Sequence, residues 1–220
     1  KQLLLEYLMF GGYPRIVTED IKTEKNRLMD EIFSSYLIKD ISYLLKVEKT
    51  DSFASLIKLL ANQSGELVNF SKLSSALGVS IQTVKKYLWY AEKTFVIKMI
   101  TPYFHNKKKE IVKSPSVYFY DLGLRNYAVG DFGNERIIER NGFIFQNFIL
   151  NCLKEKLLFS GKEIHFWRSK DNSEVDFVIV EGEKLIPLEV KYEEMKHPLI
   201  EKSLRNFIER YKVQTALVVN

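Results

Sequence analysis

Residue types that specific chemistry often needs are scarce in this sequence. Cys152 is the one cysteine among 220 residues, which excludes an internal disulfide and a zinc site made of cysteine pairs. The histidines, His105, His165 and His197, are too far apart to form an HxH or HxxxH metal motif. A GxxxxGKS/T phosphate loop is also missing, so these residues cannot hydrolyse ATP by that mechanism.

Long apolar runs are missing as well. No stretch approaches the roughly 18 residues that a membrane-spanning helix needs, and the opening stretch is too short and too acidic for a signal peptide. The chain starts with Lys1 and not with methionine, so we expect it to begin within a longer protein. A single cysteine fits a reducing compartment, and these features predict a cytoplasmic protein without a membrane partner.

Arginine is absent between residues 70 and 121, although lysine is abundant there. This quarter of the chain has nine lysines and three acidic residues, a local charge of 9 − 3 = +6, whereas the whole chain carries +5, so the remainder carries 5 − 6 = −1. A concentrated positive field predicts an anionic partner, and a solvated lysine-rich surface is the plainer interpretation. The lack of arginine disfavours direct reading of guanine, for which bidentate arginine is the commonest contact.

The first 65 residues have a helical pattern. Apolar residues recur at helical spacing over 3–9, 19–46 and 51–63, and the sequence GGYP ends the first of these stretches. We therefore expect residues 1–65 to form a helical connector segment. The chain is 46% hydrophobic, which is enough for a packed core.

A helix-turn-helix pattern follows between residues 66 and 121. A short apolar helix ends at Gly78, and Ser80 can cap a second helix whose apolar positions again recur at helical spacing. The segments VIKMITPYF and KEIVKSPSVYFYD then alternate like two strands, with three consecutive lysines between them. This order predicts a winged helix-turn-helix over residues 66–121.

A winged helix offers two groups of contacts to DNA. We expect the exposed side of its second helix and the tip of its wing to contact duplex DNA, through Gln82, Lys85, Lys86, Lys107, Lys108 and Lys109. The alternative is a winged helix that binds protein and does not bind nucleic acid.

A second domain is expected after a glycine-containing linker at 122–134. In residues 135–220 a helical pattern precedes the strand patterns IHFWR, EVDFVIV and LIPLEVK, and a further helix and strand follow. This order predicts an α/β domain, so the expected fold class of the whole chain is α+β.

The segment EVDFVIVEGEKLIPLEVK places charges on two apolar strands. Residues two apart share a face, so Glu174 points the same way as Asp176, and the turn brings Asp176 to Glu189. Two carboxylates repel unless a cation separates them or one is protonated, and Mg²⁺ prefers such oxygen ligands. Lys191 could then orient water or stabilise a phosphate. The alternative is a partly buried ion network that also includes Arg168.

These segments resemble those of a known family. The spacing from Asp176 to Glu189, with Glu-Val-Lys on an apolar strand, resembles the PD-(D/E)XK nuclease signature. Nearly the whole chain resembles the C-terminal portion of prokaryotic AAA+ family ATPases that end in a conserved domain of unknown function, through GGYPRIV, YLIKDI, LGVSIQTVKKYL, YFYDLGL, GFIFQNFI, FWR and EVDFV…PLEVK. The resemblance implies an ATPase core and its ATP site upstream of Lys1, a lid within 1–65, and a restriction-endonuclease-like domain at 135–220.

One position departs from the pattern of that family. The family has Gly-x-x-x-Glu-Asn on the first helix of the nuclease-like domain, where the acid completes the metal shell, whereas this chain has Gln146. An amide keeps an acceptor oxygen but loses the charge, so the affinity for a hard cation should fall. The resemblance thus implies a catalytic set of Asp176, Glu189, Lys191 and Gln146 whose activity is impaired.

Three functions stay open at this point. We favour a DNA-binding and regulatory portion of an AAA+ ATPase with an impaired nuclease-like domain. The alternatives are a working Mg²⁺-dependent DNA endonuclease and a protein-interaction module that binds no nucleic acid.

Overall fold

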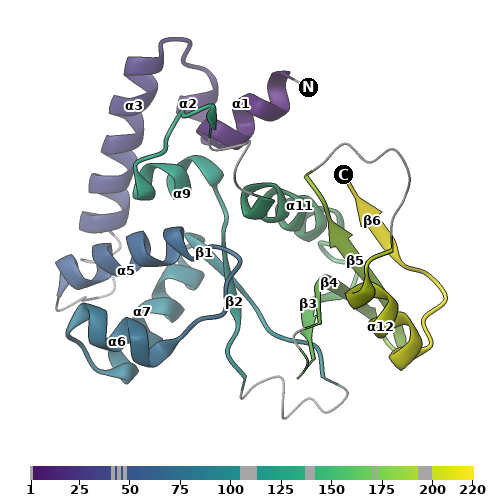
Figure 1. Ribbon diagram of the computed structural model, residues 1–220. Helices are drawn as coiled ribbons and strands as arrows, with labels where there is room; N and C mark the ends of the chain where they lie inside the picture. The colour runs from purple at the N-terminus through teal and green to yellow at the C-terminus, as the bar shows by residue number, and fades with distance from the viewer. Residues whose placement is uncertain are drawn as a thin grey trace. The chain divides into compact units, whose positions relative to one another are not determined.

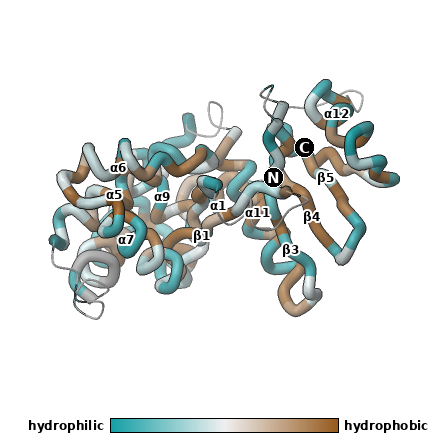
Figure 2. Tube along the Cα trace, turned by 90° about the horizontal axis from the view of Figure 1, so that it is seen from below, coloured by the Kyte–Doolittle hydropathy of each residue, from teal (hydrophilic) through white to brown (hydrophobic). Residues whose placement is uncertain are grey.

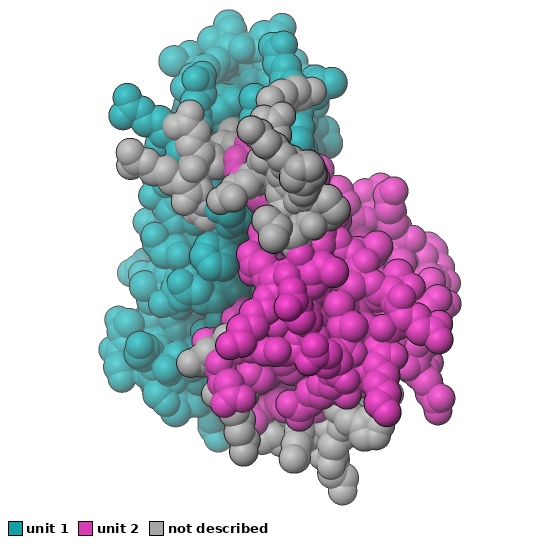
Figure 3. Space-filling view, turned by 45° about the vertical axis from the view of Figure 1, so that its right-hand side comes forward, with its two compact units in different colours: residues 1–99, 117–144 teal, residues 100–116, 145–220 magenta. Residues whose placement is uncertain are grey.

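The structure is a computed structural model that describes most of the chain. The described residues are 2–40, 43, 46, 49–104, 113–136, 142–169, 171, 173–192 and 200–220. They divide into two compact units, which Figure 3 distinguishes by colour. Unit 1 comprises residues 1–99 and 117–144, and unit 2 comprises residues 100–116 and 145–220.

Unit 1 is mainly helical (Figure 1). Its described helices are α1 (Gln2–Phe10), α2 (Pro14–Val17), α3 (Lys22–Glu31), the π-helix η1 (Ile32–Asp40), α5 (Thr50–Asn62), α6 (Phe70–Leu77), α7 (Ile81–Lys93) and α9 (Leu122–Val129). The short strands β1 (Ile97–Ile100) and β2 (Ser116–Phe119) pair with each other. The helix expected over 19–46 therefore begins at Lys22 and changes its hydrogen-bond pattern at Ile32.

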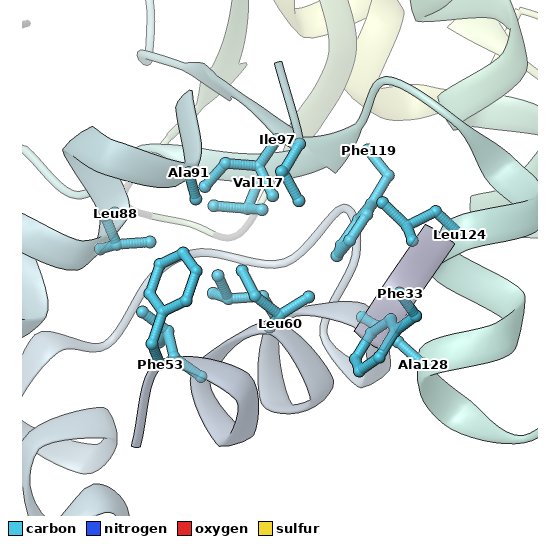
Figure 4. Packing of buried hydrophobic residues seen from close by; sticks show 14 of the residues in the cluster. Phe33, Phe53, Leu60, Leu88, Ala91, Ile97, Val117, Phe119, Leu124 and Ala128 are labelled. Carbon is cyan, nitrogen blue, oxygen red and sulfur yellow. The ribbon is translucent and has the colours of Figure 1, made fainter. Parts of the chain in front are cut away.

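Helix α5 forms the centre of the core of unit 1. Its apolar residues recur three and four positions apart, so one side of the helix is buried against the rest of the unit. Figure 4 shows Phe53 and Leu60 of α5 facing Leu88 of α7 and Val117 of β2. All four of these side chains are at most 1% exposed, so they lie in the close-packed interior.

Residues 122–134, expected to be a linker, instead continue the core of unit 1. Helix α9 occupies 122–129 and packs against α1, α3 and α5. Its Leu122 and Leu124 are at most 1% exposed. Gly130 has a φ of +82° and ends the helix, so this glycine serves as a helix cap.

The turn after α1 lies very close to the start of α9. The buried carboxylate of Asp121 accepts hydrogen bonds from the backbone N–H of Gly12 and of Leu124, both at 2.7 Å. A Cβ atom on Gly123 would lie 2.0 Å from the carbonyl oxygen of Phe10. Glycine is therefore required at 123 for steric reasons, and Asp121 holds the two segments together.

The two helices expected after residue 66 are present, with a three-residue turn between them. The Asn69 side chain accepts the N–H of Lys72 at the start of α6, and Gly78 ends α6 with a φ of +60°. The Ser80 side chain accepts the N–H of Thr83 at 3.0 Å and caps α7. The strands expected around the wing are shorter than predicted, and the expected tip, residues 105–109, lies outside the described residues.

Unit 2 consists of a mixed four-stranded sheet with helices. Its elements are α11 (Gly142–Lys156), whose first three residues are assigned to unit 1, then β3 (Glu163–Arg168), β4 (Glu174–Glu181), β5 (Lys184–Val190), α12 (Lys202–Tyr211) and β6 (Leu217–Val219). The strand order is β3-β4-β5-β6, with β6 parallel to β5 and the other pairs antiparallel. Strands β4 and β5 are mostly brown, that is hydrophobic, in Figure 2, as expected for the centre of a sheet.

The pairing of β4 contains a β-bulge that regular alternation did not predict. The register shifts by one between the pairs His165–Val178 and Trp167–Val175, so one residue of β3 faces Asp176 and Phe177 together. In agreement, Val175 and Val178 belong to one apolar cluster although they are three positions apart, and its other buried members are Trp167, Leu204 and Phe207. The described chain is therefore mixed α+β, and none of its described helices is long and apolar enough to cross a membrane.

Candidate carboxylate site and lysine surface

Asp176 lies where the pairing of β4 with β5 ends. The last pair is Phe177–Leu188, and beyond it the backbone N–H of Val190 donates to Oδ2 of Asp176 at 2.7 Å. Helix α11 brings Gln146 to the same carboxylate, and Nε2 of Gln146 donates to Oδ1 at 2.8 Å. The side chain of Asp176 thus joins the helix to the hairpin.

Glu189 is the most deeply buried acid of the site. Its side chain is on β5 and the residue is 4% exposed. Burial raises the pKa of Glu189 to about 9, and the negative charge of Asp176 adds to this effect. Glu189 is therefore protonated at neutral pH and shares a hydrogen bond with the carboxylate of Asp176.

The pKa of Asp176 is also raised, and burial is again the main cause. The hydrogen bonds from Val190 and Glu189 and the charge of Lys191 oppose this rise. Because burial raises the pKa of both groups and they share a hydrogen bond, Asp176 and Glu189 titrate as a pair. The structure thus brings the two predicted carboxylates together as a proton-sharing pair.

Lys191 follows β5 and has a different principal partner from the one expected. Its Nζ lies 2.7 Å from Oε1 of Glu201, the residue just before α12. Partial burial opposes the charge of Lys191, but the hydrogen bond and charge of Glu201, with the charge of Glu189, outweigh it and raise the pKa of Lys191. Nothing in the sequence marked Glu201, because it is ten residues from Lys191 and lies on no recognisable motif.

Arg168 and Glu174 form an exposed ion pair. Nε of Arg168 lies 3.7 Å from Oε2 of Glu174, and both side chains are more than 40% exposed. An exposed pair of this length contributes little to stability. Arg168 is the last residue of β3 and Glu174 is the first of β4, and the two residues face each other across these strands.

The nuclease resemblance implies a Mg²⁺ ion at the carboxylates of Asp176 and Glu189. Both oxygens of Asp176 already accept N–H groups, and one of the donors is the amide of Gln146, which brings no negative charge to the site. A hard cation prefers ionised oxygen ligands, so in this arrangement the residues do not fit Mg²⁺. Within the described part of the chain, Oε1 of Glu189 is buried without a donor, and no three His, Cys, Asp or Glu residues group as metal ligands.

The residues predicted to contact DNA that lie within the described part of the chain are all on helix α7. Gln82, Lys85 and Lys86 are all exposed, whereas Val84 and Leu88 on the same helix are buried. Nζ of Lys85 lies 5.4 Å above the ring of Phe70, close enough for a cation–π contact. The other predicted contacts, Lys107, Lys108 and Lys109, fall outside the described residues.

Comparison with curated proteins identifies relatives in bacteria and archaea. An uncharacterized protein of Haemophilus influenzae is 28% identical over 197 residues, which are 87% of this chain and 46% of that protein. An uncharacterized protein of Mycobacterium tuberculosis is 25% identical over 89% of this chain and 44% of its own length. One of Methanocaldococcus jannaschii is 22% identical over 86% and 42%. The chain thus spans less than half the length of these relatives, and no solved structure matches it significantly.

Two family models divide the chain near the start of α11. Residues 141–220, which include Gln146, Asp176 and Glu189, match the model described as Domain of unknown function (DUF4143). Residues 1–135, which include Lys85 and Lys86 of α7, match the model described as Domain of unknown function (DUF8612). Since this second match covers more than half of the 220 residues, the chain belongs to the family described as Domain of unknown function (DUF8612).

Proposed function

We propose that this chain is the DNA-binding and regulatory portion of a larger AAA+ ATPase, with a winged helix and a nuclease-like domain that does not cleave. The observation that carries the DNA-binding part is the exposed row of Gln82, Lys85 and Lys86 on α7. The observation that carries the absence of cleavage is the amide of Gln146 on the carboxylate of Asp176.

The position of the α7 row supports contact with duplex DNA. Residues 82, 85 and 86 are spaced i, i+3 and i+4, so they share one side of the helix. They follow a turn capped by Ser80, which is where the second helix of a helix-turn-helix contacts base edges and phosphates. Two cations on one exposed side attract phosphates at any sequence.

The charge around this row has the sign that nucleic acid requires. Within the described range 66–104 there are five lysines and two acids, so the local charge is 5 − 2 = +3. One of the acids, Glu92, accepts a hydrogen bond from the backbone N–H of Met99, so its carboxylate is held at the end of the helix. A positive field of this kind raises the rate and strength of binding to polyanions.

The carboxylate site favours a regulatory over a catalytic role for the nuclease-like domain. Three ionised acids would hold a divalent cation firmly, whereas this site has an amide in place of one acid, and burial raises the pKa of the other two. The ATPase part of the proposal rests on the sequence resemblance and on relatives about twice as long as this chain. In that arrangement a domain before Lys1 hydrolyses ATP, and the present chain transmits the effect of DNA binding to that domain.

Removing two positive charges from α7 should weaken duplex binding. For Lys85→Ala/Lys86→Ala we expect the Kd of a duplex of about 20 base pairs to rise at least tenfold at low salt. The slope of log K against log salt should fall in magnitude by about 2, one for each lost phosphate contact. Fluorescence anisotropy across a salt series measures both quantities.

The control for this experiment removes two exposed lysines from unit 2. Lys184→Ala/Lys202→Ala changes the net charge by the same amount and should leave the Kd within about twofold of the wild type. If the wild-type chain shows no affinity for DNA even at low salt, the chain does not bind DNA and the proposal is wrong.

Restoring the acid at position 146 should create a cation site. Gln146→Glu places a third carboxylate beside Asp176 and Glu189, which adds repulsion, so we expect a lower thermal midpoint in the absence of metal. Mn²⁺ should bind this variant at least about tenfold more tightly than the wild type and should recover its midpoint. Isothermal titration and thermal denaturation, with plasmid cleavage as a further readout, test this. Cleavage by the wild-type chain with Mg²⁺ or Mn²⁺ would contradict the absence of activity.

A further inference from the structure

Phe95 is an exposed aromatic residue in a backbone conformation that normally requires glycine. Its φ is +57° and it is 68% exposed. It follows α7, where the N–H of Val96 donates to the oxygen of Ala91 at 2.9 Å and the N–H of Phe95 to that of Glu92 at 3.2 Å. This pair of hydrogen bonds ends helices at a left-handed residue, most often glycine. A large side chain therefore sits at the surface in spite of strain and in spite of exposing apolar area.

The ring of Phe95 has an aromatic and a cationic neighbour. Its centroid lies 5.5 Å from that of Tyr120, and the two planes meet at 81°. Nζ of Lys98 lies 4.1 Å from the centroid of the Tyr120 ring, and Lys98 is 7% exposed. Tyr120, itself 38% exposed, is thus held between a cation and the edge or face of a second ring.

We propose that Phe95, Tyr120 and Lys98 form a stacking site for an unpaired base of single-stranded DNA. Exposed aromatic rings accept any base, because each base has a π-face. The buried Lys98 holds the Tyr120 ring, and the exposed Lys93 supplies a cation for the flanking phosphates. This inference rests on the proposed DNA binding and adds a substrate class to it, namely DNA that has a single-stranded segment next to a duplex.

The charge of the neighbourhood favours nucleic acid over an apolar protein partner. Lys93 is exposed two residues before Phe95, and the described range 66–104 has a net charge of +3. A hydrophobic protein segment would have to bury Phe95 beside these charges, whereas a nucleotide uses both the ring and the charges. The backbone of Phe95 is fixed by the hydrogen bonds that end α7, so the ring starts from a defined position when a base stacks on it.

Two DNA probes test this inference separately from the binding of duplex. One is a blunt duplex of about 20 base pairs and the other is the same duplex with an overhang of about 10 nucleotides. The wild type should bind the overhang probe more tightly than the blunt probe. For Phe95→Gly we expect about tenfold weaker binding of the overhang probe and unchanged binding of the blunt probe.

Unfolding of Phe95→Gly would not explain weaker binding of the overhang probe, because glycine suits the backbone conformation of residue 95. The thermal midpoint of Phe95→Gly should equal or exceed that of the wild type. Phe159→Gly is the matched control in unit 2, since Phe159 is 97% exposed and has a φ of +62°. It should leave the binding of both probes unchanged, and Phe95→Trp should retain binding of the overhang.

The outcomes of this experiment distinguish the two proposals. If Phe95→Gly binds the overhang probe as the wild type does, the stacking site is wrong while DNA binding stands. The same holds if the wild type binds both probes equally. If the wild type binds neither probe, the proposed function itself is overturned, and with it the inference that depends on it.

Discussion

Replacing Gly123 with alanine should prevent unit 1 from folding normally. The new Cβ would lie 2.0 Å from the carbonyl oxygen and 2.5 Å from the carbonyl carbon of Phe10. Both are backbone atoms, so no side-chain rotation relieves the clash, and α1 would have to move away from α9. We expect a loss of at least about 4 kcal/mol in the free energy of unfolding, a large part of the stability of an ordinary domain.

Chemical denaturation followed by circular dichroism measures this loss. Gly142→Ala is the matched control, because a Cβ there meets nothing within 4 Å and φ is not in the left-handed region. Its stability should stay within about 1 kcal/mol of the wild type, since alanine is the better helix former. A Gly123→Ala protein with the wild-type midpoint would show that the close approach of α1 and α9 is not part of the folded state.

The contribution of Glu189 to the free energy of unfolding should fall as the pH rises from about 4.5 to about 9. Its pKa rises from 4.5 when unfolded to about 9 when folded, because of burial and then of the charge of Asp176. A raised pKa means that the folded state holds a proton that the unfolded state has released across this window. The contribution is therefore full below pH 4.5 and is lost progressively as the pH rises toward the folded pKa.

Glu189→Gln should remove this pH dependence. The amide imitates the protonated acid and can still donate to Asp176, so the variant should be close to the wild type near pH 5 and clearly more stable near pH 9. Thermal denaturation across that range, with Glu183→Gln at an exposed turn position as control, measures the difference. Parallel curves for wild type and Glu189→Gln would mean that Glu189 is ionised in the folded protein at neutral pH. Asp176 and Lys191, whose pKa values are also raised, face the same cluster in both proteins, and Glu201 pairs with Lys191 there.

The order of the elements could be predicted from the sequence, because apolar periodicity and turn residues act locally. The hairpin of β4 and β5 is the clearest case, since alternating apolar residues and a turn with Gly182 specify it. The meeting of Asp176 with Glu189 followed from that hairpin. The sharing of a hydrogen bond by the two acids could not be predicted, because it depends on how deeply the folded chain buries Glu189.

The remaining differences come from contacts that are distant in the sequence. The glycines of 122–134 suggested a flexible linker, but Gly123 permits the close approach of Phe10, which is more than 100 residues away. The partner of Lys191 could not be predicted, since Glu201 reaches it through the start of α12. Phe95 gave no signal either, because a strained φ is a property of the folded backbone.

The division of the chain into two units has a consequence for the order of events during synthesis. The chain passes from one unit to the other three times, at residues 99–100, 116–117 and 144–145. The core of unit 1 includes Val117, Phe119 and Leu124, so this unit cannot be completed until a segment of unit 2 has already left the ribosome. Thr101 and Tyr103 must then wait for β3, because Phe166 of β3 forms a backbone hydrogen bond with each of them. A nascent chain arrested before β3 would therefore leave these two residues without Phe166, and a protease cut at any one crossing would leave the units joined by the other two.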